Sequence, residues 1–563
     1  MKDWLRETHS PGFELLRHFL LRFFDSDLVT APGQAATALI GAVAVFLPWF
    51  PVVAGPLREK YAHFNRLPFP GPYREIVRAD ELWLITLMAS AVGLLATVRW
   101  QSLFPGLRDY HALGSLPLRT RQIFLAKLLA LLLVATGAIV VLSALPSLVF
   151  PAVSAGRWAL RPLGARVAAH FLSSAAVCYF AFFALTALQG LLLIVLHPRR
   201  FALVTGYVQG FLAAAMVLLM VLSFSIQPQI ANAALRPAAA RWLPPVWFLG
   251  LYQVLAGDTD PAMRALACTA QAALAVAVVL VLFAYLAGYR RYRELLVEGG
   301  ASPARDRRWG VAILVWLVPQ PRRQAVTAFM LKTLADSSRH RVILMGYGGF
   351  ALALAFSGMA GITGTVERGR AAAAGFVYVH VTLLVCLLAG LRQVFSLPME
   401  LHANWIFRLT ESEGRLEWLH AVDHFVLLTG ALAIIVIPFP VEAALLGWRA
   451  LAEVIQCTAL GLLGYEWLFA SWEKLPFTCS HLPAKTPPWM LALRLFALLG
   501  FLPMVTGILL ISLYNAVAFC VVLALLLAAW TRVRAARREG WGDLRLKYEE
   551  APDPAIHGLN LLR

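Results

Sequence analysis

Charged residues are scarce in this chain of 563 residues, and what it lacks excludes several classes of protein. Aspartate, glutamate, lysine and arginine make up 14% of the sequence, against 60% hydrophobic residues. A water-soluble core cannot hide that much apolar surface, so the bilayer must be the solvent. The chain also has no Gly-x-x-x-x-Gly-Lys-Ser/Thr loop for nucleotide phosphates. If ATP powers this protein, a separate polypeptide must bind it.

Cysteines are few, and no two of them form a close pair. The six are Cys178, Cys268, Cys386, Cys457, Cys479 and Cys520. Most lie inside apolar runs, where a small buried thiol is common, so we expect no disulfide and no zinc site. Residues 1–27 mix charged with apolar side chains and lack the uninterrupted apolar core of a signal peptide. We expect them to remain on the mature protein as an amphipathic helix at the membrane interface.

Apolar runs long enough to cross a membrane recur along the chain. A helix needs roughly 20 apolar residues to cross the hydrocarbon layer, and about twelve runs reach that length. They cover residues 32–54, 80–99, 127–151, 168–196, 203–226, 263–289, 342–363, 373–396, 421–440, 449–470, 489–510 and 512–531. The sequence therefore predicts an all-α integral membrane protein with about twelve transmembrane helices.

Lysine and arginine are unevenly divided between the two predicted sides of the membrane. If the N-terminus is cytoplasmic, the loops and tails on that side carry most of them, as the positive-inside rule requires. The first outer loop departs from this pattern, since it contains Arg58, Lys60, Arg66, Arg74 and Arg78. The bias over the whole chain still predicts that both termini are cytoplasmic. We assign the net charge of +18 to membrane orientation rather than to nucleic acid.

Two pairs of similar segments indicate an internal duplication. His18–Ser26 resembles Ala328–Ser337, with one residue inserted, and Ser115–Leu118 resembles Ser396–Met399 after the second span of each half. We predict two pseudo-repeated six-helix halves, each opened by an amphipathic interfacial helix. The predicted divisions are a first half at 1–290, a basic cytoplasmic linker with the second amphipathic helix at 291–341, a second half at 342–532 and a cytoplasmic tail at 533–563.

The segment Leu107–Lys127 has the pattern of a helix that lies parallel to the membrane. Leu113, Leu116 and Phe124 contribute to an apolar stripe, and Pro117 begins a new turn. Basic side chains near its end anchor the next span at the lipid headgroups.

This segment resembles the loop between the second and third spans of permease subunits of ABC transporters of the type-2 export family. Pro244–Tyr252 is similar to the outer re-entrant element of these permeases. Leu391–Arg408 and Leu475–Pro483 are similar to cytoplasmic signatures of a bacterial subgroup with two fused halves. The resemblance covers most of the chain.

The resemblance implies the membrane-spanning part of an exporter in a bacterial plasma (inner) membrane, working with two copies of an ATP-binding subunit. That subunit would hold ATP and magnesium, while this chain would be a transport subunit without catalytic residues, bound cofactor or metal. The substrate class stays open between lipid, peptide, glycan and drug-like amphiphile.

Two cytoplasmic segments would dock on the ATP-binding subunit, according to the same resemblance. The first runs from Asp109 to Lys127, and the second from Pro398 to Arg408, although Glu400 stands where the family pattern has basic residues. The residues implied in coupling are Asp109, Leu113, Leu116, Pro117, Arg119, Lys127, Pro398, Glu400, Asn404 and Arg408.

Three other functions remain as alternatives. An ion-coupled secondary transporter would need an ionisable site at the midplane, but Glu466 and Arg494 fall near predicted cytoplasmic ends, where long side chains reach water. A membrane-embedded enzyme acting on a lipid-linked substrate would need a polar cluster facing a cavity. A non-transporting scaffold is the third alternative.

One group of side chains has the residue types of a metal or acid–base site. It lies on one face of the helix that enters the ninth predicted span and consists of Glu417, His420, Asp423 and His424. The group lacks the His-Glu-x-x-His order of a zinc protease, and interfacial anchoring also accounts for it.

Overall fold

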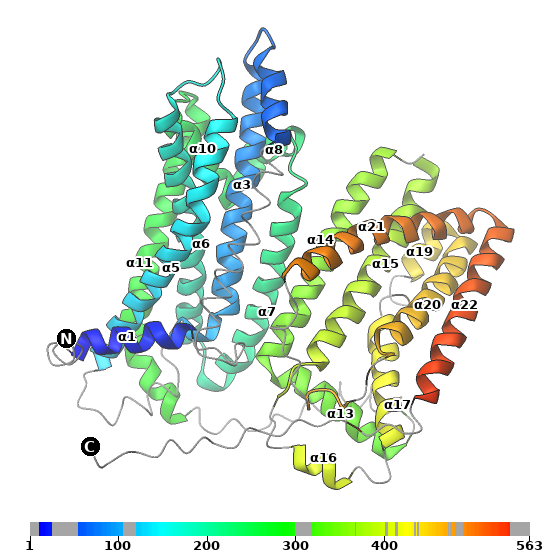
Figure 1. Ribbon diagram of the computed structural model, residues 1–563. Coiled ribbons are helices and arrows are strands. Elements are labelled where there is room, and N and C mark those ends of the chain that lie inside the picture. The colour runs from blue at the N-terminus through cyan, green and yellow to red at the C-terminus, as the bar shows by residue number, and fades with distance from the viewer. Residues whose placement is uncertain are drawn as a thin grey trace. The chain divides into compact units, whose positions relative to one another are not determined.

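The chain divides into two units in the computed structural model. Unit 1 is Met1–Pro303 and unit 2 is Ala304–Arg563. The residues that the structure describes are 11–24, 55–104, 120–298, 318, 320–365, 368–399, 404–410, 415–432, 435, 439–470, 472, 474–478, 488–540 and 546. All regular secondary structure in these residues is helical (Figure 1).

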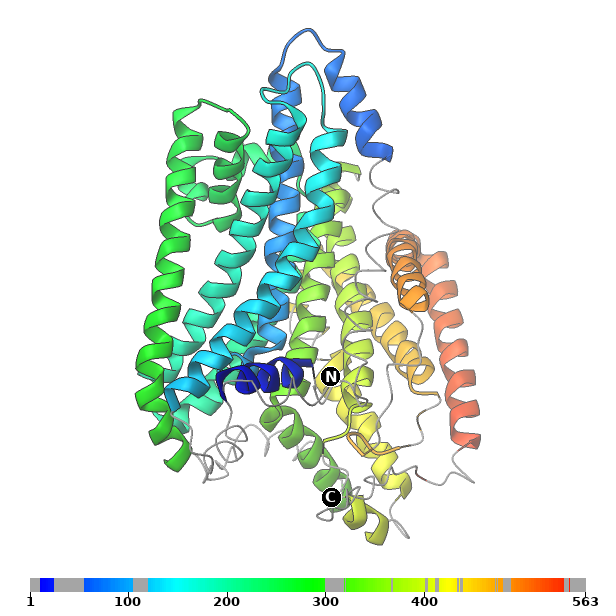
Figure 2. The ribbon, with the colours of Figure 1, turned by 60° about the vertical axis from the view of Figure 1, so that its left-hand side comes forward.

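Unit 1 is a bundle of long helices with short helices between them. Its helices are α1 (Pro11–Phe24), α3 (Gly71–Val98), η1 (Trp100–Ser102), α5 (Thr120–Val153), α6 (Leu163–Val195), α7 (Pro198–Ser223), α8 (Pro228–Ala234), α9 (Pro237–Ala240), α10 (Pro244–Leu255) and α11 (Pro261–Glu298). Helix α6 packs against α3, α5, α10 and α11, and α3 also packs against α7. Helix α1 lies across one end of the bundle, against α5 (Figures 1 and 2).

Unit 2 combines a pair of long helices with more irregular elements. They are α13 (Pro321–Asp336), α14 (Ser338–Thr365), α15 (Arg368–Phe395), α16 (Asn404–Thr410), α17 (Arg415–Phe425), η4 (Val426–Leu432), α19 (Phe439–Leu446), α20 (Trp448–Leu468), α21 (Pro488–Leu513) and α22 (Ala516–Glu539). Helices α14 and α15 run side by side, whereas α21 crosses α15 at a steep angle (Figures 1 and 2).

Eight helices in the described part of the chain are long and apolar enough to cross a membrane. They lie at 71–98, 122–153, 163–195, 204–223, 261–288, 338–359, 372–395 and 516–539, and each overlaps a span predicted from the sequence. The prediction of an all-α, multi-pass membrane protein is confirmed at this level. The first predicted span, 32–54, lies outside the described residues.

The remaining predicted spans, all in unit 2, take other forms. In the region 421–440, α17 ends at Phe425 and the π-helical segment η4 follows it. Such a segment inserts an extra residue into the turn and is frequent at functional sites. Helix α20 is 21 residues long but is not among the eight, and α21 lies crosswise. The count of twelve spans therefore stays a prediction.

Small residues let the long helices approach closely in both units. A Cβ added at Gly190 on α6 would lie 2.4 Å from Cβ of Ala284 on α11. A Cβ added at Gly390 on α15 would lie 2.9 Å from Cγ of Tyr347 on α14. Close packing of this kind holds helices together in lipid, where the hydrophobic effect does not drive their association.

Helix starts follow local sequence signals. Proline stands in the first turn of α7, α10 and α13, where its missing N–H costs no hydrogen bond. Asn515 caps α22, because its Oδ1 accepts hydrogen bonds from the backbone N–H groups of Val517 and Ala518 at 3.0 and 3.1 Å. None of the residues in the most apolar 18-residue window of α22 is fully buried, although the helix packs against α20 and α21.

Candidate functional site

The two unit 2 segments that carry the family resemblance, Leu391–Arg408 and Leu475–Pro483, meet in the structure. The backbone N–H of Met399 donates to the carbonyl of Phe477 at 3.1 Å. The backbone N–H of Phe477 in turn donates to the carbonyl of Phe395 at 3.0 Å. The sequence does not predict this contact, which joins segments about 80 residues apart in the chain.

Asn404 ties the start of α16 to the same place. Its Nδ2 donates to the carbonyl of Thr478 at 2.7 Å, and the Asn404 side chain is buried. We refer to residues 395–399, 404 and 475–478 as the platform. Of the other residues implied in coupling by this segment, Pro398 belongs to the platform, Glu400 lies outside the described residues, and only the backbone of Arg408 is described.

Aromatic packing holds the platform together around Phe477. This residue has φ of +68°, a left-handed conformation that is costly for a bulky side chain. Its buried ring packs edge-on against the rings of Phe395, His340 and Phe329, at centroid distances of 5.5, 5.0 and 5.9 Å. His340 Nε2 also lies 3.2 Å from the carbonyl of Leu397. Helices α13 and α14 therefore fix the platform through Phe329 and His340.

Most of the first predicted coupling segment lies outside the described residues. Its coupling residues in that part are Asp109, Leu113, Leu116, Pro117 and Arg119. Lys127 is described and lies on α5. It is buried, and its Nζ is 4.9 Å from the ring centroid of Phe19 on α1. Phe19 and Leu15 form a small core with apolar side chains of α5. The amphipathic helix α1 thus packs against the last residues of the predicted segment.

Unit 1 buries a carboxylate beside a histidine among its long helices. Glu81 Oε2 on α3 lies 3.5 Å from His170 Nε2 on α6, and both side chains are fully buried. His170 Nδ1 lies 2.9 Å from Ser147 Oγ, whose own proton is donated to the carbonyl of Ser143 at 2.6 Å. Ser174 Oγ also lies 3.3 Å from Nδ1, so this nitrogen faces two hydroxyls and Nε2 faces the Glu81 carboxylate.

A second acidic group in unit 1, Asp80, forms an ion pair with a lysine and a hydrogen bond with a tyrosine. Lys60 Nζ lies 2.7 Å from Asp80 Oδ1, and the Tyr61 hydroxyl donates to Asp80 Oδ2 at 2.7 Å. Burial, followed by the Asp80 charge, raises the pKa of Tyr61 well above its ordinary value, so this hydroxyl stays a donor. Lys60 is one of the basic residues that depart from the positive-inside pattern, and Arg78 is another, paired with Asp258 at 3.0 Å.

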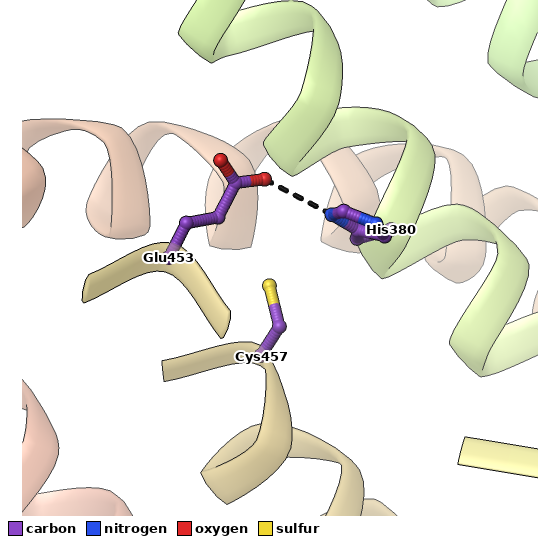
Figure 3. Close-up of side chains that lie close together, drawn as sticks. All are labelled: His380, Glu453 and Cys457. Carbon is purple, nitrogen blue, oxygen red and sulfur yellow. Dashed lines mark hydrogen bonds and ion pairs between the residues drawn. The ribbon is translucent and has the colours of Figure 1, made fainter. Parts of the chain in front are cut away.

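Unit 2 buries a histidine between two carboxylates. His380 Nδ1 on α15 lies 3.0 Å from Glu453 Oε1 on α20, and Nε2 lies 3.0 Å from Glu442 Oε1 on α19. Cys457 follows Glu453 by one helical turn, and Figure 3 shows its sulfur directed toward the space between Glu453 and His380. The His380, Glu453 and Cys457 ligand atoms lie within 4.8 Å of one another.

An arginine cluster in unit 2 uses Asp423, one of the four residues considered for a metal site. Arg537 Nη2 lies 2.9 Å from Asp423 Oδ1, and Nη1 lies 2.8 Å from Glu466 Oε2. The Tyr465 hydroxyl also donates to Asp423. His424 Nδ1 lies 2.7 Å from the carbonyl of His420 instead of meeting the acids.

Two of these arrangements differ from the roles that the sequence indicated. Asp423 contacts Arg537, Tyr465 and, at 3.7 Å, Nδ1 of His420, but the four residues of the group do not form a metal-binding cluster in the described part of the chain. Glu466, considered a residue that reaches water at a span end, is buried against Arg537. Arg494 lies in α21, and its side chain is not described.

Comparison with known proteins adds no relative to these observations, because no family model, curated protein or solved structure matches the chain.

Proposed function

We propose that this chain is the membrane-spanning permease component of an ATP-driven exporter, with ATP and magnesium held by two copies of a separate subunit. The observation that carries the proposal is the short helix α16. Asn404 anchors its start to the platform, while Trp405 and Leu409 are 62% and 77% exposed. An apolar surface on a firmly seated element is typical of a site that binds another protein. By the positive-inside count, this end of unit 2 faces the cytoplasm, where an ATPase would bind.

The platform is also suited to transmitting force. Backbone hydrogen bonds join its two segments to each other. Phe477 also packs against Phe329 of α13 and His340 of α14. Because packed interiors deform little, a push on α16 would move α13, α14 and α15 together. Such coupling is what an exporter driven by a partner subunit requires.

Parallels between the units support two pseudo-repeated halves. Helices α3 and α15 are both 28 residues long, and each precedes a Ser-Leu-Pro sequence. Helices α1 and α13 each lie before the long helices of their unit. Helix α1 packs against α5, which begins within the first predicted coupling segment, and α13 packs against α17, which follows the second. The proposed arrangement has twelve spans and both termini in the cytoplasm of a bacterium.

The docking surface can be tested by co-purification of the ATP-binding subunit from native membranes. We expect Trp405→Asp and Leu409→Asp to reduce the bound subunit at least tenfold, because each places a charge on the proposed apolar contact. Trp242→Asp is the matched control, since Trp242 is also exposed but lies in unit 1 between α9 and α10. Equal binding by the α16 variants and this control would contradict docking at α16.

A proton-coupled secondary transporter is the second candidate, favoured by the buried histidine–carboxylate groups. Glu81 with His170, and His380 with Glu453, can each hold a proton inside a predicted membrane region. In liposomes without any ATPase, this candidate predicts uptake driven by a pH gradient and lost in Glu81→Gln. The exporter predicts no such uptake.

A further inference from the structure

The buried side chains around His380 have the composition of a metal site. His380, Glu453 and Cys457 come from α15 and α20, and Glu442 comes from α19. All four side chains are at most 2% exposed. Figure 3 shows that the imidazole, the carboxylate and the thiol converge on one point.

Charge balance favours a cation at this point. Two carboxylates share one imidazole, and no ion pair among the described residues joins Glu442 or Glu453 to a lysine or arginine. Glu453 Oε2 and Glu442 Oε2 also lack a hydrogen-bond partner. Burying carboxylates without compensation costs several kcal/mol each, by order of magnitude. A divalent ion would compensate both carboxylates, and a Cys457 thiolate among its ligands would leave a net charge of −1.

The two ring nitrogens of His380 suit different tasks. Nδ1 lies beside Glu453 and can give its lone pair to a metal, while Nε2–H lies 3.0 Å from Glu442 Oε1. A metal-bound histidine usually donates its other N–H to a carboxylate, which fixes the ring and its tautomer. Glu442 is in the position of that orienting carboxylate.

The donor set selects the class of metal. A thiolate with an imidazole and a carboxylate disfavours magnesium and calcium, which take oxygen ligands, and suits zinc. Ligand atoms of a tetrahedral zinc site are about 3.3–3.7 Å apart, so the present separations, all within 4.8 Å, need only small side-chain adjustments.

We propose that His380, Glu453 and Cys457 bind one zinc ion, with Glu442 orienting the imidazole. Because these side chains are almost fully buried, the ion would be enclosed by the protein and would join α15 to α20. This departs from the expectation of no zinc site, and it does not depend on the proposed function, since an exporter and a secondary transporter could each contain it.

The test is Co²⁺ titration of the full chain, purified without a polyhistidine tag and stripped of metal. We expect one Co²⁺ per chain, a near-ultraviolet thiolate-to-cobalt band, and displacement of the cobalt by Zn²⁺. Cys457→Ser removes the band and weakens binding at least tenfold. Glu442→Gln keeps the band and weakens binding about 10- to 100-fold. Cys386→Ser is the control, because Cys386 is also a buried cysteine of unit 2.

Absence of stoichiometric binding, or a band that survives in Cys457→Ser, would overturn the proposal. In the first case the group holds protons instead of a metal. If Cys457→Ser does not fold, X-ray absorption of the zinc-loaded wild-type chain decides: one sulfur at about 2.3 Å supports the site, and a shell without sulfur overturns it.

Discussion

Units 1 and 2 both bury a histidine beside acidic side chains, but the number of carboxylates beside the histidine differs. Unit 1 places one carboxylate, Glu81, beside His170. Unit 2 places two, Glu442 and Glu453, on opposite sides of His380. In unit 1 the acid lies on α3 and the histidine on α6, whereas in unit 2 the histidine lies on α15 and the acids on α19 and α20. A single proton can balance the first group, but the second needs a further positive charge.

The units also differ in how exposed the basic side chains are that pair with their other acidic residues. Asp80 in unit 1 is paired with Lys60, whose side chain is 35% exposed. Asp423 and Glu466 in unit 2 share Arg537, whose side chain is 2% exposed, and Glu466 has a second, more distant partner in the partly exposed Arg534 at 3.9 Å. Unit 2 therefore depends more strongly on a few buried groups, and substitutions should reveal this.

The largest effect is expected from Arg537→Met. It leaves Asp423 and Glu466 without their buried partner, which should lower the free energy of unfolding by about 3–5 kcal/mol. Lys60→Met should cost only about 1 kcal/mol, because water screens a partly exposed pair. Unfolding in mixed detergent micelles measures both, with the exposed Arg538→Met as a control near zero. Equal losses in the two units would remove the contrast.

The histidines provide the second comparison. In metal-free protein, His380→Leu should cost about 3–5 kcal/mol, since it leaves two buried acids without a partner. His170→Leu should cost about 1–3 kcal/mol, since it removes the neighbour of one buried acid, while the Ser147 hydroxyl keeps the carbonyl of Ser143. The same unfolding measurement applies, and a larger loss for His170→Leu would reverse the proposed order.

The tyrosines provide the smallest contrast. Tyr61→Phe removes a charged hydrogen bond to Asp80 and should cost about 1.5–3 kcal/mol. Tyr465→Phe should cost about 0.5–1.5 kcal/mol, because Asp423 keeps Arg537.

The contribution of Tyr61 should also depend on pH. Because the pKa of Tyr61 is raised by folding, its contribution is complete below about pH 10 and is lost as the pH rises through the folded-state value. Wild-type stability should therefore fall at high pH more than that of Tyr61→Phe. Parallel curves for the two proteins would contradict this role of the hydroxyl.

Hydropathy predicted most of the long helices because membrane thickness sets their length and apolar content. It failed to anticipate the form of the last third of the chain. Helix α17 passes into the π-helical η4, and α21 lies across α15 although it is apolar enough to be predicted as a span. Such features depend on packing against neighbouring helices, which a hydropathy window does not include.

The buried sites were harder to predict because their partners are distant in sequence. His380 and Glu453 are 73 residues apart, and each looks unremarkable within its own apolar run. Ionisable residues are rare in such apolar runs, so each one indicates a candidate functional site. By this criterion Glu81, His170 and Glu453 are candidates in the same way as Glu466. Their pairing required the fold. The sequence predicted part of the platform, because the resemblance to export permeases marks both of its segments. The contact between the two segments could not be predicted without the fold.

The proposed function requires a separate ATP-binding subunit that works with this chain. The most direct test is to purify the tagged protein from its native membrane in mild detergent, identify the bound proteins and measure vanadate-sensitive ATP hydrolysis. We expect an ATP-binding subunit at two copies per chain, with hydrolysis in the eluate and loss of the subunit in Asp109→Ala and Arg119→Ala. A chain that purifies alone and without ATP hydrolysis would contradict it.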